Sequence, residues 1–147
     1  MSSSPFQRIN EFFESYAQAL ESFDTKAMAQ HYNIPCTFLS DDASTVFSEA
    51  SKLEGLFNQG TTFYKQFGIV YSRPEVFSKR FWTDRIVKAR VNWQYFDQDK
   101  KPIYNCDYQY VLRLDKHDQY KIEISIAVNE KERMEEWLKK KKAAESA

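Results

Sequence analysis

Three strand-length runs follow one another in Thr83–Ala127, TDRIVKARVNWQYFDQDKKPIYNCDYQYVLRLDKHDQYKIEISIA. In each run, large apolar and aromatic side chains occupy every second position, which is the pattern of a strand with one buried face. These positions are Val87, Ala89, Val91, Trp93 and Tyr95, then Tyr104, Cys106, Tyr108, Tyr110, Leu112 and Leu114, and finally Tyr120, Ile122, Ile124 and Ile126. Because the polar segments 97–101 and 115–119 that join the runs are short, the stretch predicts an antiparallel meander with one aromatic face.

That aromatic face has the chemistry of a pocket floor. It carries Trp93, Tyr104, Tyr108 and Tyr110, which combine bulk with hydroxyl groups. Such side chains suit a cavity with a few oriented polar groups better than they suit a dry core.

The length and composition predict a single domain over residues 1–147, with a core at about 6–127 and a carboxyl-terminal helix at about 129–145. Lys and Arg together number 21, as do Asp and Glu, so no net charge would attract the chain to nucleic acid or to an anionic membrane. Neither is expected as a partner. Only 3 residues are Gly, and no glycine pattern of a dinucleotide site or P-loop occurs.

The sequence also lacks the patterns of a targeting segment, a membrane span, a reactive cysteine and a metal site. Residues 1–8 have no basic stretch followed by an apolar run, and no run of about 18 apolar residues occurs, so a cytoplasmic chain is expected. Cys36 and Cys106 fall on the apolar phase of predicted strands and are expected to be buried, unpaired thiols without nucleophilic character. With only His31 and His117 to join them, no zinc-like spacing arises, and neither a metal nor a cofactor is expected.

The amino-terminal third predicts two helices and a hairpin. Ser4 caps a first helix whose apolar residues recur at steps of three and four, and Asp24 caps a short second helix. Pro35 disfavours helical geometry in the residue before it, so the second helix is predicted to end at Asn33–Ile34. The turn-forming segment 40–44 then joins two short strands.

Two more helices flank the long strands. Ser48 is the predicted cap of the third helix, and Gly68 is its predicted end. Pro74 lies in the strand that follows, which places that strand at a sheet edge or a bend. Asn129 is the predicted cap of the last helix, with Glu132 at the third helical position, and the lysines near its end complete a solvated helix terminus.

This order of elements predicts an α+β fold in which helices pack on one face of a strongly curved antiparallel sheet. It resembles the nuclear transport factor two-like superfamily, also called the SnoaL-like or ketosteroid isomerase-like fold. The resemblance covers about Phe12–Ile126 and rests on three phrases, YAQALESFD from Tyr16, HYNIPC from His31 and YVLRLD from Tyr110. It implies a cone with a ligand pocket at its open end and a homodimer formed through the outer sheet face. The helix after Asn129 is an addition to the minimal pattern.

The isomerase branch of that superfamily uses a tyrosine on the first helix, a protonated acid on a later strand and a carboxylate base. An ungapped match places Tyr16 at the tyrosine, but it places Ser40 at the base and Tyr110 at the acid. Chemistry of that kind is therefore disfavoured, and the catalytic residues stay unknown. Tyr16 and Tyr110 still offer two hydroxyl donors to one ligand oxygen, and a structural role for Tyr16 is an equal alternative.

The other polar candidates have structural alternatives as well. His31 is a base oriented by Asp41 or Asp42, or it is a residue that interacts with the end of the second helix. The two aspartates are explained by turn chemistry alone, and Asp107 lies on the polar phase of its strand, toward solvent or a partner subunit. Trp137 closes the cone, packs on the domain or joins a partner chain.

The function predicted from the sequence is the binding of a small apolar or aromatic molecule that carries one or two oxygens. The expected pocket lies between the first helix, the third helix and the inner sheet face, and it is lined by Tyr16, Tyr32, Phe57, Tyr64, Trp93, Tyr108 and Tyr110. The resemblance also implies that any catalysis is cofactor-independent, of the cyclase, isomerase, dehydratase or hydrolase type.

The alternative is a non-enzymatic homodimeric module whose cone is filled by its own aromatic side chains. Its interface is the polar outer face, formed by Arg90, Asn92, Gln94, Asn105, Asp107 and Gln109. A cavity of roughly 300 Å³ or more distinguishes ligand binding from a filled cone.

Overall fold

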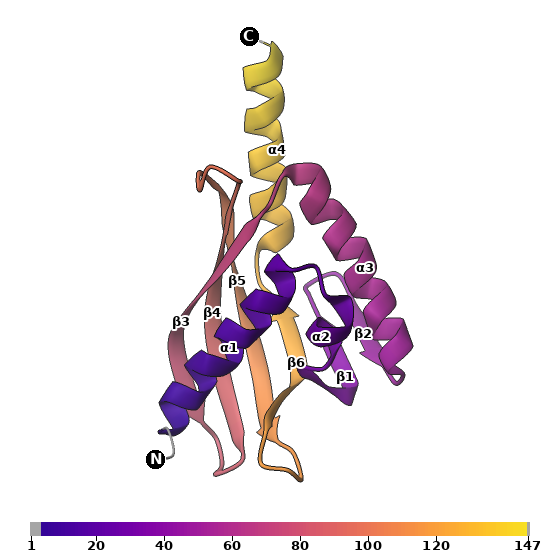
Figure 1. Ribbon diagram of the computed structural model, residues 1–147, viewed down its shortest axis with the longest axis vertical. Coiled ribbons are helices and arrows are strands. Elements are labelled where there is room, and N and C mark those ends of the chain that lie inside the picture. The colour runs from indigo at the N-terminus through magenta and orange to yellow at the C-terminus, as the bar shows by residue number, and fades with distance from the viewer. Residues whose placement is uncertain (1–3, 147) are drawn as a thin grey trace.

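A computed structural model describes residues 4–146, so residues 1–3 and 147 of the predicted domain lie outside the described part (Figure 1). The fold is α+β, as predicted. The elements are α1 (Pro5–Glu21), α2 (Thr25–Ala29), β1 (Tyr32–Leu39), β2 (Ser44–Phe47), α3 (Ala50–Phe67), β3 (Tyr71–Phe81), β4 (Ile86–Phe96), β5 (Pro102–Leu114), β6 (Tyr120–Ala127) and α4 (Glu130–Ser146). None of the helices in residues 4–146 combines the length and the hydrophobicity of a membrane-spanning segment.

One sheet holds the molecule together, with the strand order β2-β1-β6-β5-β4-β3. Helix α1 lies across its long strands, and α3 flanks it on the side of β1 and β2 (Figure 1). All neighbours are antiparallel except β1 and β6, which pair in parallel, whereas the sequence predicted an antiparallel sheet. The parallel pair is possible because most of the chain separates these two strands, so no tight turn has to join them.

The predicted phase of β4, which lies between β5 and the edge strand β3, is confirmed. Its five alternate positions, Val87, Ala89, Val91, Trp93 and Tyr95, are all buried. Above them pack Ile9 and Phe13 of α1, which are fully buried as well. The core therefore lies between α1 and the sheet, in the part of the cone where α1 crosses it.

The predicted phase of β6 is wrong beyond Ile122. Leu112 pairs with Ile122, but the preceding Val111 pairs with Ile124, so β6 carries one extra residue at this point. An extra residue turns all later side chains to the opposite face of the sheet. Ile124 and Ile126 therefore lie on the outer face, and Ser125, at 3% exposure, points inward.

The first two helix caps are confirmed, since Ser4 Oγ accepts from Gln7 N at 3.2 Å and Asp24 Oδ1 accepts from Ala27 N at 3.0 Å. The predicted end of the second helix at Asn33–Ile34 is wrong. Helix α2 stops at Ala29 because the chain already pairs with β6, where Ile122 N donates to the carbonyl of His31 at 2.9 Å.

The third helix begins one residue later than predicted. Ser48 is not its cap, because α3 starts at Ala50 and Glu49 occupies the cap position without a side-chain hydrogen bond to the helix. Gly68 does end the helix, with a φ of 74° in the left-handed region that glycine adopts without strain. Pro74 lies on β3, which is an edge strand, as predicted.

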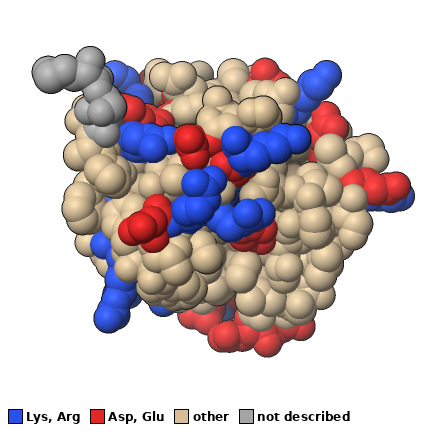
Figure 2. Space-filling view, turned by 90° about the horizontal axis from the view of Figure 1, so that it is seen from below, with Lys and Arg blue, Asp and Glu red and all other residues tan. Residues whose placement is uncertain are grey.

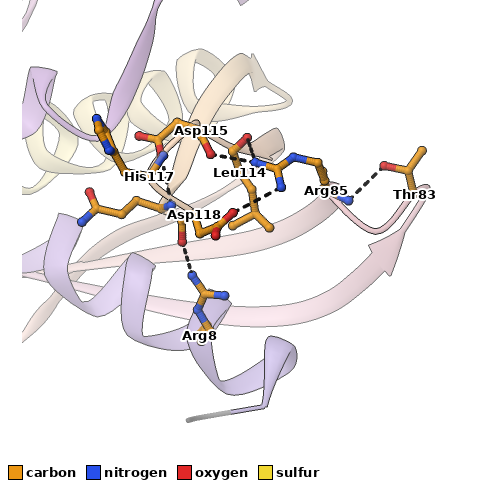
Figure 3. Close-up of polar contacts among 8 residues, drawn as sticks. Arg8, Thr83, Arg85, Leu114, Asp115, His117 and Asp118 are labelled. Atoms are coloured by element: carbon orange, nitrogen blue, oxygen red, sulfur yellow. Dashed lines mark hydrogen bonds and ion pairs between the residues drawn. The ribbon is translucent and has the colours of Figure 1, made fainter.

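At the end of the cone where α1 begins, two arginines join three segments (Figure 3). Arg85 donates to the carbonyls of Leu114 and Asp115, at 3.1 and 2.7 Å, and to Asp118 Oδ1 at 3.2 Å. Arg8 donates to the Asp118 carbonyl at 2.6 Å. We call Arg8, Arg85 and Asp118 the arginine clamp. Viewed from this end, basic and acidic side chains are interspersed, and neither sign forms a continuous patch (Figure 2).

Candidate functional site

A cavity of about 380 Å³ lies between the inner sheet face and helices α1, α2 and α3. Side chains from α1, β1, α3, β4 and β5 line it, and the structure brings all seven residues proposed from the sequence to its wall. They are Tyr16, Tyr32, Phe57, Tyr64, Trp93, Tyr108 and Tyr110. The wall also includes Gln59 and Phe63 of α3, which are exposed and form part of its rim.

Four of these side chains form a hydroxyl cluster, defined as Tyr16, Tyr32, Trp93 and Tyr110. The Tyr16 and Tyr32 hydroxyls lie 2.6 Å apart, and Trp93 Nε1 donates to the Tyr110 hydroxyl at 2.8 Å. A hydroxyl has one proton to donate, and the Tyr16–Tyr32 bond uses only one of the two protons of that pair. Within residues 4–146, the proton of Tyr110 has no acceptor either, so the cluster offers two donors to the cavity.

Burial keeps these phenols protonated. Removal from water raises the pKa of Tyr16, Tyr32 and Tyr110, because the phenolate form loses its solvation. The nearby Tyr16 raises the pKa of Tyr110 further. At neutral pH the cluster therefore consists of hydrogen-bond donors and cannot supply a general base.

A carboxylate forms the second polar group of the cavity. Glu130, the first residue of α4, lies on the cavity wall. Its Oε1 accepts from the Tyr108 hydroxyl at 2.5 Å, while its Oε2 accepts from Tyr95 at 3.4 Å and from Tyr104 at 3.5 Å. The Cys106 thiol also approaches Oε2, at 3.7 Å. We call Glu130, Tyr95, Tyr104 and Tyr108 the carboxylate cluster.

The start of α4 is fixed to β5 by Asn129 and Asp107. Asp107 N donates to Asn129 Oδ1 at 2.7 Å, and Asn129 Nδ2 donates to Asp107 Oδ2 at 3.3 Å. The predicted cap, Asn129, therefore directs its side chain to the strand, although its carbonyl still accepts the helical bond from Arg133 N. These bonds orient the next residue, Glu130, toward the cavity.

Trp137 packs on its own domain, which was one of the three alternatives. Its ring lies 5.3 Å from that of Phe67 on α3 and 6.4 Å from that of Tyr104 on β5, measured between centroids. Beyond this contact α4 projects away from the cone (Figure 1). Trp137 thus holds the first two turns of α4, which carry Glu130, against the sheet.

His31 has a structural role in this arrangement. Its Nδ1 lies 2.7 Å from the carbonyl of Ala27 at the end of α2, and its Nε2 lies 3.0 Å from Ser15 Oγ. Orientation by Asp41 or Asp42 is therefore wrong, since both ring nitrogens have other partners. Burial lowers the pKa of His31, and its ring stacks on Tyr16 at 5.3 Å.

Neither cysteine is activated. Both thiols are free and buried, and burial raises the pKa of Cys36 to about 11. The pKa of Cys106 is raised as well, by burial and by the charge of Glu130. Within the described range 4–146, no group of three or more His, Cys, Asp and Glu side chains is placed to hold a metal ion.

Two residues of the cavity wall, Glu130 and Ser125, were not predicted from the sequence. Ser125 reaches the cavity only because of the extra residue in β6, which the alternating pattern does not reveal. Glu130 looks like an ordinary acidic residue at a helix start. One signal was present, since three tyrosines on one face of β5 need acceptors for their hydroxyls when buried.

Comparison with known proteins identifies the family to which this chain belongs. The family described as NTF2-like protein (DUF6841) matches residues 6–130 of the chain, which run from the second residue of α1 to Glu130, the first residue of α4. No curated protein matches the sequence.

Several solved structures share the fold. One is an NTF-2-like protein of unknown function from Shewanella oneidensis MR-1, with 11% identity, 85% of this chain and 99% of that chain covered, and a TM-score of 0.67. A ketosteroid isomerase-like protein from Erwinia carotovora atroseptica SCRI1043 has 10% identity, 86% and 97% coverage, and a TM-score of 0.66. A protein from Catenulispora acidiphila in complex with S-DNPA has 12% identity, 84% and 91% coverage, and a TM-score of 0.61. At such low identity the likeness concerns the fold alone.

Proposed function

Because this chain belongs to the NTF2-like protein family (DUF6841), we propose that its cone binds a small molecule in the aromatic-lined cavity. The observation that carries the proposal is the cavity of about 380 Å³, which exceeds the roughly 300 Å³ that small-molecule sites require. The structure of the Catenulispora acidiphila protein in complex with S-DNPA supports ligand binding by this fold. The cone filled by its own side chains is the less favoured alternative.

The wall chemistry favours an apolar or aromatic ligand that carries an oxygen. Phe57 and Trp93 offer flat apolar surfaces, and the hydroxyl cluster offers two donors to one acceptor. Replacing Tyr110 by Phe removes one donor and leaves the ring in place. We expect Tyr110→Phe to weaken binding about tenfold, since a hydrogen bond contributes roughly 0.5–1.5 kcal/mol. It should also lower the free energy of unfolding by about 1–3 kcal/mol, because the buried Trp93 Nε1–H loses its acceptor.

The decisive experiment blocks the cavity from α3. A Cβ at Gly60, which lies on the cavity wall, or at Gly55, which lies elsewhere on the same helix, meets no atom within 4 Å. Gly60→Phe should fill the cavity, and Gly55→Phe is the matched control. We expect calorimetric titration with 2-naphthylmethanol to show binding to the wild type and to Gly55→Phe and none to Gly60→Phe. Binding that survives Gly60→Phe contradicts the assignment, as does a wild type that binds neither this probe nor its amine analogue.

A second candidate function is cofactor-independent proton transfer. Glu130 supplies a carboxylate to the same cavity as the donors Tyr16 and Tyr110, and a carboxylate base was one of the two groups missing from the match to the isomerase branch, the other being the protonated acid, whose place Tyr110 occupies. The test follows deuterium exchange at the acidic C–H bonds of 1-(2-naphthyl)propan-2-one by NMR. Faster exchange with the wild type than with Glu130→Gln supports this candidate, and equal rates contradict it.

We propose further that two copies of the chain pair through the outer sheet face. The extra residue in β6 turns Ile124 and Ile126 to this face, where Ile126 lies beside Leu39 and Val46 is 60% exposed. Light scattering should give a dimer for the wild type and a monomer for Ile126→Lys, with Gln98→Lys in an exposed turn as control. A monomeric wild type contradicts the pairing.

We also propose a cytoplasmic location. Cys36 and Cys106 are free thiols in the structure, and thiols stay reduced in that compartment. Fluorescent tagging of the full chain in its host cell tests this, and signal confined to another compartment contradicts it.

A further inference from the structure

The carboxylate of Glu130 faces an aromatic cavity with neutral partners only. Of the described side chains that line the cavity, it alone carries a formal charge at neutral pH. The ion pairs formed within residues 4–146 involve Glu21, Asp42, Asp118 and Glu123 and do not include it. Glu130 is partly buried, and a carboxylate partly removed from water favours an opposite charge nearby, because hydrogen bonds from neutral groups replace its lost hydration incompletely.

The two oxygens of this carboxylate are held very differently. Oε1 has a short bond of 2.5 Å to Tyr108. Oε2 has hydroxyl contacts of 3.4 and 3.5 Å, both beyond the 2.5–3.0 Å of a normal O–H···O bond, and a contact of 3.7 Å with the Cys106 thiol, which is a weak donor. Oε2 is therefore an acceptor whose present donors are all distant, and it can take a closer one.

Aromatic rings surround the same position. Tyr64 and Tyr95 lie 5.3 Å apart between ring centroids, Tyr95 and Tyr104 lie 5.0 Å apart, and Tyr64 donates to the Tyr95 hydroxyl at 3.0 Å. Tyrosine rings attract cations through their negative faces, most strongly where water is excluded. A carboxylate oxygen amid tyrosine rings attracts a cation through both effects.

We propose that the ligand is a protonated amine on an apolar or aromatic skeleton, and that its ammonium group donates to Glu130 Oε2. This inference rests on the proposed function and specifies its ligand class. Tyr108 and Tyr110 stack at 5.7 Å, so the carboxylate cluster and the hydroxyl cluster adjoin each other. A short molecule can therefore reach both, with the amine at Glu130 and an oxygen at Tyr110. Anionic ligands are disfavoured, since no described cationic side chain lines the cavity.

The test compares two probes that differ in one group. 2-Naphthylmethylamine is protonated at pH 7, and 2-naphthylmethanol is its neutral counterpart. We expect calorimetry with the wild-type chain to show the amine binding at least about tenfold more tightly than the alcohol, because hydrogen bonds between charged groups are stronger than neutral ones. Glu130→Gln should abolish this preference. Glu132→Gln, which removes an exposed charge from the same helix, should leave it unchanged.

Each outcome separates the two proposals. An alcohol that binds as well as the amine overturns the amine inference and leaves the pocket intact. A preference that survives Glu130→Gln overturns the role of Glu130. If neither probe binds the wild type, the proposed function fails and the inference fails with it. If Glu130→Gln does not fold, the wild type can be titrated at increasing salt concentration instead. Salt should weaken the binding of the amine and leave the binding of the alcohol unchanged. If salt changes the affinity of neither probe, the inference is overturned.

Discussion

The two ends of the cone use charge in opposite ways. At the end where α1 begins, Arg8 and Arg85 donate to Asp118 and to backbone carbonyls at 2.6–3.2 Å (Figure 3). The side chains of Arg85 and Asp118 are about half exposed or more. At the cavity, Glu130 faces tyrosine hydroxyls, and one of its oxygens has only distant donors. The arginine clamp is complete within the chain, whereas the carboxylate cluster leaves an acceptor for a molecule from outside. We therefore infer that the arginine clamp stabilises the fold, whereas the cavity is the proposed ligand site.

The largest expected difference between the two ends involves a pair of tryptophans. Trp93 is 2% exposed on the cavity wall, while Trp82 is 55% exposed beside the turn between β3 and β4. We expect Trp93→Ala to lower the free energy of unfolding by about 3–5 kcal/mol, because it leaves a void and removes the donor to Tyr110. Trp82→Ala should change it by no more than about 0.5 kcal/mol. Urea unfolding measures both, and similar losses would remove the distinction between the ends.

Asn129 should have the next largest effect. Asn129→Ala removes both side-chain bonds to Asp107, including the one that satisfies a backbone N–H, so we expect a loss of about 1–3 kcal/mol. It should also release Glu130 and reduce the preference for an amine. Hydrogen exchange along α4 and probe titration follow the two effects. A variant that keeps the amine preference shows that Asn129 does not position the carboxylate.

Arg85 should matter less than its number of contacts suggests. Its side chain is about half exposed, and exposed ion pairs contribute roughly 0–1 kcal/mol. We therefore expect Arg85→Ala to lower stability by at most about 1 kcal/mol and to leave probe binding unchanged. Thermal unfolding and the same titrations are the measurements. Weaker binding in this variant would mean that the two ends are coupled.

The smallest effect concerns pH. Burial lowers the pKa of His31 below its ordinary value, so between these two values the unfolded chain binds more protons than the folded one. Stability is therefore fully present above the ordinary value near 6.5 and decreases as the pH falls below it. His31→Gln should flatten this decrease in urea titrations between pH 7 and pH 5. His117→Gln, at the clamp end, is the control. A slope that survives His31→Gln contradicts the assignment.

Much of the fold could be predicted from the sequence because its regular strands obey a local rule. In β4 every second residue is buried, so the alternation of side chains alone identified the inner face and Trp93. In β6 one extra residue reverses that alternation, and nothing near Glu123 in the sequence marks it. Local periodicity thus assigns a face only where the pairing register is continuous.

The candidate site divides in the same way. The tyrosines on strands and helices followed from periodicity, but Glu130 depends on contacts between segments far apart in the chain. Glu130 faces the cavity only when Asn129 is hydrogen-bonded to Asp107 and Trp137 packs on Phe67. No single segment contains this information. A buried hydroxyl needs an acceptor, however, so a face rich in tyrosine could have prompted a search for one.

The central claim is that the cone encloses a ligand site, and a high-resolution crystal structure of the protein purified without added ligand tests it most directly. We expect electron density for a small molecule or for ordered water in the cavity between Trp93, Tyr110 and Glu130. A cone filled by rearranged phenylalanine and tyrosine side chains, with no space between these residues, would contradict the claim.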